Sequence, residues 1–182
     1  MNSSKTRPNH LYLTGYRGCG KSTIAKELAA RLNFPLIDLD ELIELEAGMT
    51  IAKIFEAESE AGFRDRESVS LQQVAAGTRS VISLGGGAIL RPNNREIIAQ
   101  SGWCVWLDAS PETIADRLST DATTGQRRPS LTGLPVVEEI ETVMRTREPL
   151  YRDSSHLRID TTDRSIVQIA SEIIDVWCAT QG

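Results

Sequence analysis

Short apolar runs alternate along the chain with longer segments in which apolar residues recur every three to four positions. Runs of the first kind predict β-strands, and they occupy residues 10–14, 36–38, 80–84, 104–107 and 157–159. Segments of the second kind predict helices, and they occupy residues 21–32, 40–45, 51–58, 60–76, 93–100, 111–118, 135–151 and 166–176. Strands that alternate with helices form a parallel sheet covered on both faces. We therefore predict a three-layer α/β/α fold around a five-stranded parallel sheet.

The segment from residue 120 to residue 135 interrupts this alternation. It reads TDATTGQRRPSLTGLP, which is rich in Gly, Thr and Pro and poor in apolar residues. A loop of this length inside a compact domain is either functional or disordered, and Arg127 and Arg128 in its middle favour function. We interpret it as a mobile lid on a single domain that spans residues 1–182, because no other linker is long enough to separate two domains.

Composition narrows the class of protein. A net charge of −5 argues against a general nucleic-acid binder, since such a surface needs clustered Lys and Arg. The apolar runs are too short to cross a membrane, and no secretory leader is recognisable. Metal-ligand and disulfide spacings are not evident among the cysteines, and the two histidines fit edge positions better than metal ligation. We therefore expect a cytoplasmic protein. The cysteines are Cys19, Cys104 and Cys178, and the histidines are His10 and His156.

Residues 15–22, GYRGCGKS, match the phosphate-loop pattern G-x-x-x-x-G-K-[ST] between a predicted strand and a predicted helix. Gly15, Gly18 and Gly20 let backbone N–H groups turn towards phosphate oxygens. Lys21 is expected to reach the β- and γ-phosphates of ATP, and the Ser22 hydroxyl to ligate Mg²⁺. The alternative is a glycine-rich turn that only joins strand to helix. The flanking elements favour nucleotide binding.

Two carboxylates, Asp38 and Asp40, end the second predicted strand. Their i, i+2 spacing places both on one face of the strand, at the end where ligands bind in parallel sheets. One carboxylate suits Mg²⁺, often through water, and the other can orient or deprotonate an attacking hydroxyl. The alternative is that Asp40 only caps the next helix.

Five motifs that follow one another in order resemble the shikimate kinases, small P-loop enzymes of the nucleoside-monophosphate-kinase fold. The opening string LYLTGYRGCGKSTIAKELAARLNFPLIDLDELIE is similar to the start of that family. It is followed by IAKIF with GFRDRE, by SLGGGA, by the pair RP in the predicted lid and by R-x-P-L-Y. The resemblance covers the chain from about residue 11 to residue 151.

The resemblance implies a role for each motif. In the family, Arg64 and Arg147 hold the shikimate carboxylate, and the N–H groups of residues 85–87 face substrate oxygens. Asp40 binds and activates the accepting hydroxyl, while Asp38 holds Mg²⁺ through water. Glu67 could orient Arg64, since the two lie three positions apart on one helix. Without the family, Arg64 reads as a solvated helix residue, and the glycines read as a tight turn.

The implied ATP site combines the phosphate loop with residues further along the chain. Lys21 and Arg128 join Asp40 as the catalytic set, with Arg128 closing over the phosphates and Arg127 as an alternative for that task. The substrate set is Asp40, Arg64, Gly85, Gly86, Gly87 and Arg147, and the substrate-binding helical region is expected at about residues 40–76. The ATP set is Gly15, Gly18, Cys19, Gly20, Lys21, Ser22, Thr23, Arg117, Arg128 and Arg164.

Cys19 of the ATP set and Asp108, which lies outside these sets, each need a separate interpretation. Cys19 occupies a variable place in the phosphate loop, where a redox role is the alternative to a purely structural one. Asp108 follows an apolar run, as metal-binding acids do in other P-loop proteins, but the family does not use it for the metal. We therefore expect a structural or helix-capping role for Asp108, ahead of the Ser110-Pro111 pair.

The resemblance predicts a shikimate kinase: a monomeric enzyme with ATP as co-substrate and Mg²⁺ as cofactor, which makes shikimate 3-phosphate in the pathway to chorismate and the aromatic amino acids. Two alternatives remain, because a fold alone does not determine function. One is a gluconate or nucleotide monophosphate kinase of the same fold. The other is a nucleotide-binding regulatory module without catalytic activity.

Overall fold

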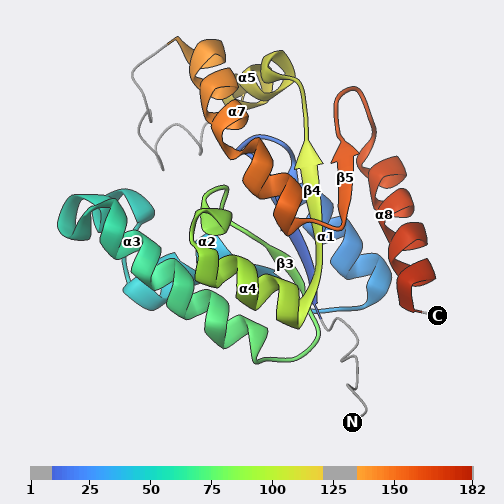
Figure 1. Ribbon diagram of the computed structural model, residues 1–182, viewed down its shortest axis with the longest axis horizontal. Coiled ribbons are helices and arrows are strands. Elements are labelled where there is room, and N and C mark those ends of the chain that lie inside the picture. The colour runs from blue at the N-terminus through green and yellow to red at the C-terminus, as the bar shows by residue number, and fades with distance from the viewer. Residues whose placement is uncertain (1–9, 121–134, 182) are drawn as a thin grey trace.

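The computed structural model describes residues 10–120 and 135–181, and its centre is one parallel β-sheet (Figure 1). The strands are β1 (His10–Thr14), β2 (Leu36–Asp38), β3 (Val81–Ser83), β4 (Gly102–Asp108) and β5 (Leu157–Asp160). Within the described residues they form a five-stranded sheet in the order β2-β3-β1-β4-β5, with every neighbouring pair parallel. The predicted sheet is therefore confirmed, and its central strand is the one that leads into the phosphate loop.

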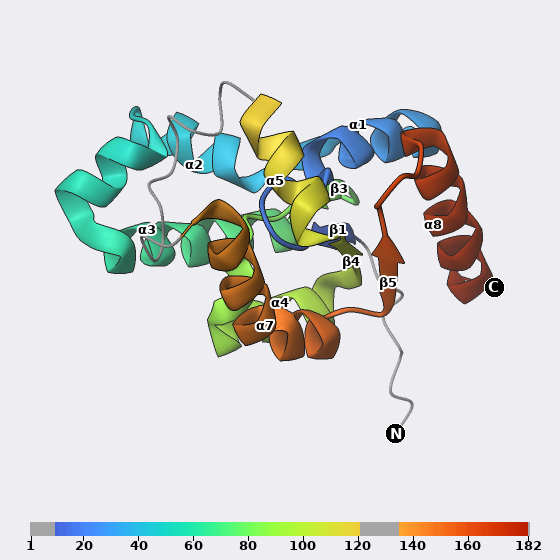
Figure 2. The same ribbon diagram turned by 90° about the horizontal axis from the view of Figure 1, so that it is seen from above.

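Helices cover both faces of the sheet, as Figure 2 shows from above. One face carries α1 (Lys21–Leu32) and α8 (Ile166–Gln181), and the other carries α3 (Ile51–Ala75), α4 (Pro92–Ser101) and α7 (Val136–Ser154). The short helix α2 (Leu39–Ala47) follows β2, and α5 (Pro111–Thr120) follows β4. This arrangement confirms the three-layer α/β/α prediction.

The alternation of side chains along β1 explains the two layers of the core. Leu11 and Leu13 pack with α1 and α8 on one face, whereas Tyr12 between them packs with α3 and α4 on the other. All three are fully buried, because successive residues of a strand point to opposite faces and both faces are covered. Strand β4 shows the same division, with Val105 on the first side and Trp106 on the second.

The boundary predicted between two helices near residue 59 is present as a kink inside α3. Ser59 has φ 64° and ψ 177°, which lies outside the helical region and ends the regular turn there. A short 3₁₀ helix, η1 (Ala88–Leu90), was not predicted, because three residues carry no periodic signal. Residues 121–134, which hold most of the predicted lid with Arg127 and Arg128, lie outside the described residues. Within the described part of the chain, no helix is both long and apolar enough to cross a membrane.

His10 begins β1 in a buried position that disfavours its charged form. The side chain is fully buried, with Nε2 3.3 Å from the carbonyl oxygen of Ala75 and the ring 5.7 Å from that of Tyr12. Burial lowers the pKa of His10, because a protonated imidazole would lose its water, and the Ala75 carbonyl opposes this only in part.

The depressed pKa of His10 predicts a loss of stability on mild acidification. The unfolded chain binds a proton at the ordinary histidine pKa, and the folded chain binds it only at lower pH. The contribution of neutral His10 to the free energy of unfolding is therefore present above the ordinary histidine pKa. It is lost as the pH falls towards the pKa of His10 in the folded protein. Urea unfolding between about pH 7.5 and about pH 5.5 should show a shallower fall in the free energy of unfolding for His10→Gln than for the unsubstituted protein. Equal falls would contradict this assignment.

Candidate active site

The phosphate loop, residues 15–22, passes from β1 to α1 through three glycines with positive φ: 137° at Gly15, 79° at Gly18 and 94° at Gly20. Residues other than glycine rarely adopt such φ values. At Gly15 space also excludes one, because an added Cβ would lie 2.1 Å from the carbonyl oxygen of Leu107 on β4. Helix α1 begins at Lys21, so its N-terminus adjoins the loop, as anion-binding loops require.

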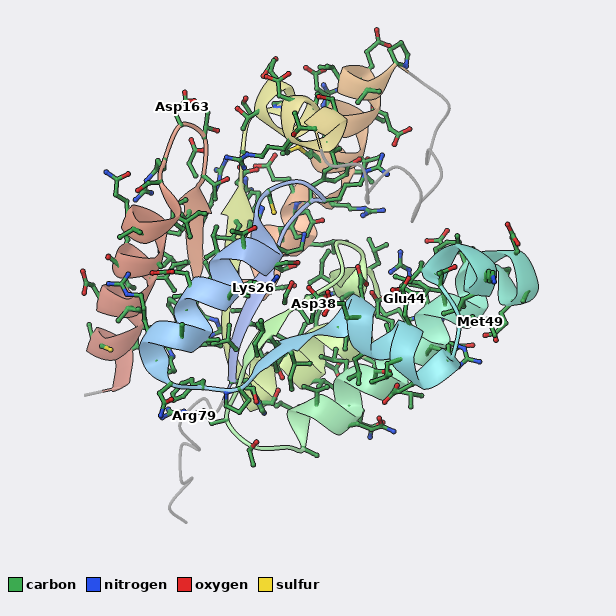
Figure 3. All side chains as sticks on the ribbon, turned by 180° about the vertical axis from the view of Figure 1, so that it is seen from behind. Lys26, Asp38, Glu44, Met49, Arg79 and Asp163 are labelled. Carbon is green, nitrogen blue, oxygen red and sulfur yellow. The ribbon has the colours of Figure 1, made fainter. Side chains whose placement is uncertain are left out.

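The predicted cationic and hydroxyl groups of the loop lie close to its backbone and to β2. Lys21 Nζ donates to the carbonyl oxygens of Gly15 and Tyr16, at 2.9 Å each. Ser22 Oγ donates to Asp38 Oδ2 at 2.8 Å, so the two predicted metal ligands are neighbours. Figure 3 shows Asp38 between α1 and α2. Thr23 is exposed in the first turn of α1.

Cys19 packs inward from the loop into the core between the sheet and α1. Its thiol is fully buried, and burial raises its pKa although Lys21 acts in the opposite direction. A protonated, inaccessible thiol is a poor redox centre, so the structure argues against the redox alternative. Any contact of Cys19 with a nucleotide would use its backbone.

The capping role considered for Asp40 is wrong, because Asp38 is the cap of α2. Asp38 Oδ1 accepts from the backbone N–H groups of Asp40 at 3.1 Å and Glu41 at 3.4 Å. Sequence reasoning placed the helix start at residue 40, whereas α2 begins at Leu39. The start of α2 therefore does not depend on the Asp40 carboxylate, which lies in the first turn of that helix.

Residues 85–87, here called the glycine loop, pass close to three charged side chains. A Cβ added at Gly85 would lie 2.7 Å from Asp40 Oδ1 and 2.9 Å from Glu67 Oε1. One added at Gly87 would lie 2.4 Å from the guanidinium of Arg64. Real Cβ atoms essentially never approach so closely, so a side chain at either position would require these charged groups to move, and glycine lets the loop lie directly against them. The same loop adjoins the phosphate loop, because a Cβ at Gly86 would lie 3.2 Å from the Gly15 carbonyl oxygen.

Arg64 is buried, and the interpretation as a solvated helix residue is wrong. Its side chain is 10% exposed and donates to Glu67 Oε2 at 2.8 Å and to Glu60 Oε1 at 3.2 Å. Burial alone would lower the pKa of Arg64, but the carboxylates of Glu67 and Glu60 outweigh burial and raise it. The predicted pairing with Glu67 is confirmed, and it holds a charged fork against the glycine loop.

Helix α7 reaches the same loop from the opposite side. Arg147 donates to the carbonyl oxygen of Gly86 at 3.2 Å, and the Tyr151 hydroxyl donates to the same oxygen at 2.6 Å. The fold thus gathers Asp40, Arg64 and Arg147 around one loop, although they lie on three different helices. Tyr151 was quoted in the R-x-P-L-Y motif but given no role. Its hydroxyl anchors α7 to the glycine loop.

Arg117 and Arg164, two arginines of the predicted ATP set, lie in different environments. Arg117 donates to the carbonyl oxygen of Thr161 at 2.8 Å and to that of Gly18 at 3.4 Å, so it joins the phosphate loop to the β5–α8 connection. Arg164 donates instead to the Asp160 carbonyl and forms an ion pair with Glu172 of α8. Neither of these contacts brings Arg164 to the phosphate loop.

The expected structural role of Asp108 is confirmed, and the capping role is wrong. Asp108 Oδ2 accepts from Arg158 at 2.6 Å, which fastens β4 to β5, and Oδ1 accepts from the N–H of Ala109 at 3.0 Å. The cap of α5 is provided by Ser110, whose Oγ accepts from the N–H of Thr113 at 3.2 Å. Asp108 therefore stabilises the end of β4 by accepting hydrogen bonds from the Ala109 backbone and from Arg158 of the neighbouring strand β5.

One ion pair of the phosphate loop was missed by sequence reasoning. Arg17 donates to Glu139 Oε1 of α7 at 2.9 Å, and these side chains are only 21% and 4% exposed. The loop pattern treats position 17 as variable, and its partner lies 122 residues away. No local signal could have found the pair. It ties the loop to the first turn of α7, close to the end of the predicted lid.

This ion pair predicts a coupling that can be measured with a double-mutant cycle. We expect Arg17→Met and Glu139→Gln to show a coupling energy of about 2 kcal/mol in urea unfolding, because one carboxylate is buried. The exposed pair Arg152 and Glu148 on the same helix is the control, where we expect less than about 0.5 kcal/mol. Equal couplings would show that the Arg17 pair contributes no more than a surface contact.

Three features define a P-loop kinase of the nucleoside-monophosphate-kinase-like class. They are the parallel sheet, the phosphate loop and the glycine loop beside it with its charged neighbours. A family model described as "Shikimate kinase" matches residues 17–178. The chain belongs to the shikimate kinase family.

Individual relatives agree with this assignment. A shikimate kinase from Rhodopirellula baltica is 57% identical over 174 residues, covering 96% of this chain and 93% of that protein. One from Symbiobacterium thermophilum is 41% identical over 166 residues, covering 91% and 94%. A solved structure of shikimate kinase from Acinetobacter baumannii in complex with shikimate has a TM-score of 0.87 at 34% identity, covering 96% of this chain and 95% of that one.

Proposed function

We propose that this chain transfers the γ-phosphoryl group of ATP to the 3-hydroxyl of shikimate, giving shikimate 3-phosphate and ADP. The observation that carries this proposal is the gathering of Asp40, Arg64 and Arg147 around the glycine loop, within contact of the phosphate loop. A carboxylate and two guanidinium groups beside a phosphate cradle suit an acceptor that is itself a hydroxylated acid. The family assignment and the relatives reported above support the same substrate.

The acid group of the acceptor is assigned to the two arginines. Guanidinium forks bind carboxylates through paired, charge-assisted hydrogen bonds. Arg64 is held by Glu67 and Glu60, and Arg147 is held by the Gly86 carbonyl, so both forks are positioned before the acceptor arrives. Pre-positioned groups lose little entropy on binding. The backbone N–H groups of the glycine loop complete this part of the site.

Asp40 is assigned to the accepting hydroxyl. Its carboxylate lies in the first turn of α2, directly after β2, and against Gly85. There it accepts the hydroxyl proton and aims the oxygen at the γ-phosphorus. Because phosphoryl transfer is largely dissociative, this positioning contributes more than early proton removal.

The phosphate loop is assigned to the triphosphate, and its oxygen ligands fit Mg²⁺. The Ser22 hydroxyl and the Asp38 carboxylate lie 2.8 Å apart, and both are oxygen ligands of the kind that Mg²⁺ prefers, with water completing its shell. When bound, Mg²⁺ would neutralise charge on the β- and γ-phosphates. Lys21 would exchange its bonds to the Gly15 and Tyr16 carbonyls for phosphate oxygens. Arg128, outside the described residues, is assigned to the lid that would close over the phosphates. We also propose that the enzyme is monomeric and cytoplasmic.

Release of ADP with different acceptors tests the proposal. The protein would be incubated with ATP and Mg²⁺ and with shikimate, gluconate, AMP or no acceptor in parallel. We expect turnover with shikimate alone. Turnover with gluconate or AMP would keep the kinase class and reject the acceptor site described here. No turnover with any acceptor, from protein that still binds ATP, would favour a regulatory module without catalysis.

A further inference from the structure

A cavity, here called the rear cavity, lies between α7 and the carboxyl ends of β4 and β5, where α5 begins. Its volume is about 500 Å³, within the range of pockets that hold small molecules. Tyr16 of the phosphate loop, Trp106 of β4 and Tyr151 of α7 line it. Lys21, Asp40, Arg64 and Arg147 are not among its lining residues, so the rear cavity is separate from the site assigned above.

The aromatic residues of the rear cavity form an ordered wall. Trp106 stacks on Tyr151 with ring centroids 5.8 Å apart and an interplanar angle of 19°. The guanidinium of Arg158 lies 4.5 Å from the centroid of the Trp106 ring, so one cation already uses this wall. Aromatic faces attract cations and the apolar bodies of ligands.

Tyr16 supplies a polar group that the protein does not use. The residue is only 2% exposed, and its buried hydroxyl has no hydrogen-bond partner among the residues that the structure describes. An unsatisfied buried hydroxyl destabilises the protein, because it has lost its hydrogen bonds to water and gained none in return. A ligand in the cavity that Tyr16 lines can supply the missing partner.

Carboxylates outnumber guanidinium groups in the lining. Asp108 and Asp160 come from the sheet, and Glu141 and Glu148 come from α7, against Arg145 and Arg158. Asp108 and Arg158 neutralise each other, and Glu148 pairs with Arg152. Within residues 10–120 and 135–181, no ion pair is formed by Glu141 or by Arg145. The lining therefore carries net negative charge.

We propose that the rear cavity is a binding site for a small organic cation, a primary amine on an aromatic or apolar body. The ammonium group is held by the carboxylates of α7, with Glu141 as the unpaired one, and the Tyr16 hydroxyl accepts one of its protons. The body of the ligand lies against Trp106 and Tyr151. Because Tyr16 belongs to the phosphate loop and Tyr151 bonds to Gly86, the ligand contacts the rear of both loops of the active site.

Tyramine and 3-(4-hydroxyphenyl)propionate are suitable probes, because they share a phenol ring and carry opposite charges. Binding of each would be titrated by ligand-observed NMR with the full-length protein. We expect saturable binding of tyramine with a Kd below about 1 mM and no saturable binding of the propionate. Saturating ATP should leave tyramine bound. Absence of saturation, preference for the propionate, or displacement of tyramine by ATP would each overturn the proposal.

Variants on α7 identify the site without touching the assigned catalytic residues. The variant Glu141→Gln with Glu148→Gln should weaken tyramine binding about tenfold, through loss of charge-assisted contacts. The variant Glu138→Gln with Asp153→Asn is the matched control, because it removes the same charge from exposed positions of the helix outside the cavity. Equal affinities for the two variants would overturn the proposal. Because binding is measured directly, the result does not depend on which acceptor is phosphorylated.

Discussion

Asp40→Asn is expected to lower kcat for phosphoryl transfer to shikimate about 10³-fold, within the range of general-base and positioning effects. Asparagine has nearly the same shape, so the close approach of Gly85 is preserved, but its amide cannot accept the hydroxyl proton and orients the acceptor less strongly. The carboxylate does not cap α2, since Asp38 does. The folded structure and the affinity for ATP should therefore be nearly unchanged. Steady-state release of ADP and a separate titration of ATP would measure the two effects.

A matched control is Asp65→Asn, which removes an exposed carboxylate from α3 that forms an ion pair with Arg91. It should retain kcat within about twofold. If Asp40→Asn retained wild-type kcat, Asp40 would have no part in activating the acceptor. If Asp40→Asn lost ATP binding as well, its effect would be on the fold and not on the acceptor hydroxyl.

Arg147→Met is expected to raise the KM for shikimate about 100-fold, with a smaller effect on kcat. Loss of a fork that binds a carboxylate in a poorly hydrated site typically costs about 3 kcal/mol, which corresponds to roughly this factor. The KM for ATP should change little, because the hydrogen bond of Arg147 is made to Gly86 of the glycine loop. Initial rates at varied shikimate and fixed ATP would give both constants.

The methyl ester of shikimate separates a direct contact from a structural effect. If Arg147 binds the carboxylate, the unsubstituted enzyme should prefer the acid strongly over the ester, and Arg147→Met should lose most of that preference. A merely structural role would leave the preference unchanged. Arg152→Met, an exposed arginine on the same helix, serves as the control and should retain both the KM and the preference.

Local patterns in the sequence were sufficient for the elements and for the phosphate loop. Alternating apolar runs located each strand to within a few residues, because strand and helix periodicities are local properties. The pattern G-x-x-x-x-G-K-S located the loop for the same reason, because each glycine is required by the backbone angle φ at its own position. Even the break near residue 59 was predictable, although its form, a kink at Ser59 inside α3, was not.

Neighbouring positions competed for roles that local patterns could not resolve. Both Asp38 and Asp40 are suitable N-cap residues, and only the observed start of α2 assigns the cap to Asp38. Asp108 and Ser110 show the same ambiguity ahead of α5, and Ser110 is the cap. A shift of one or two residues at a helix end changes which side chain caps the helix.

The sequence by itself determined the fold class, the phosphate loop and the family, since these depend on periodicity and on motifs whose residues are adjacent. Only the tertiary structure decided which charges are buried together. Arg64 changes from a solvated helix residue to a buried fork because the glycine loop packs against it. Arg17 meets Glu139 across 122 residues, and the rear cavity forms where α7 passes the ends of β4 and β5. Such contacts depend on how distant elements pack, and the burial that results sets the strength of each charge interaction.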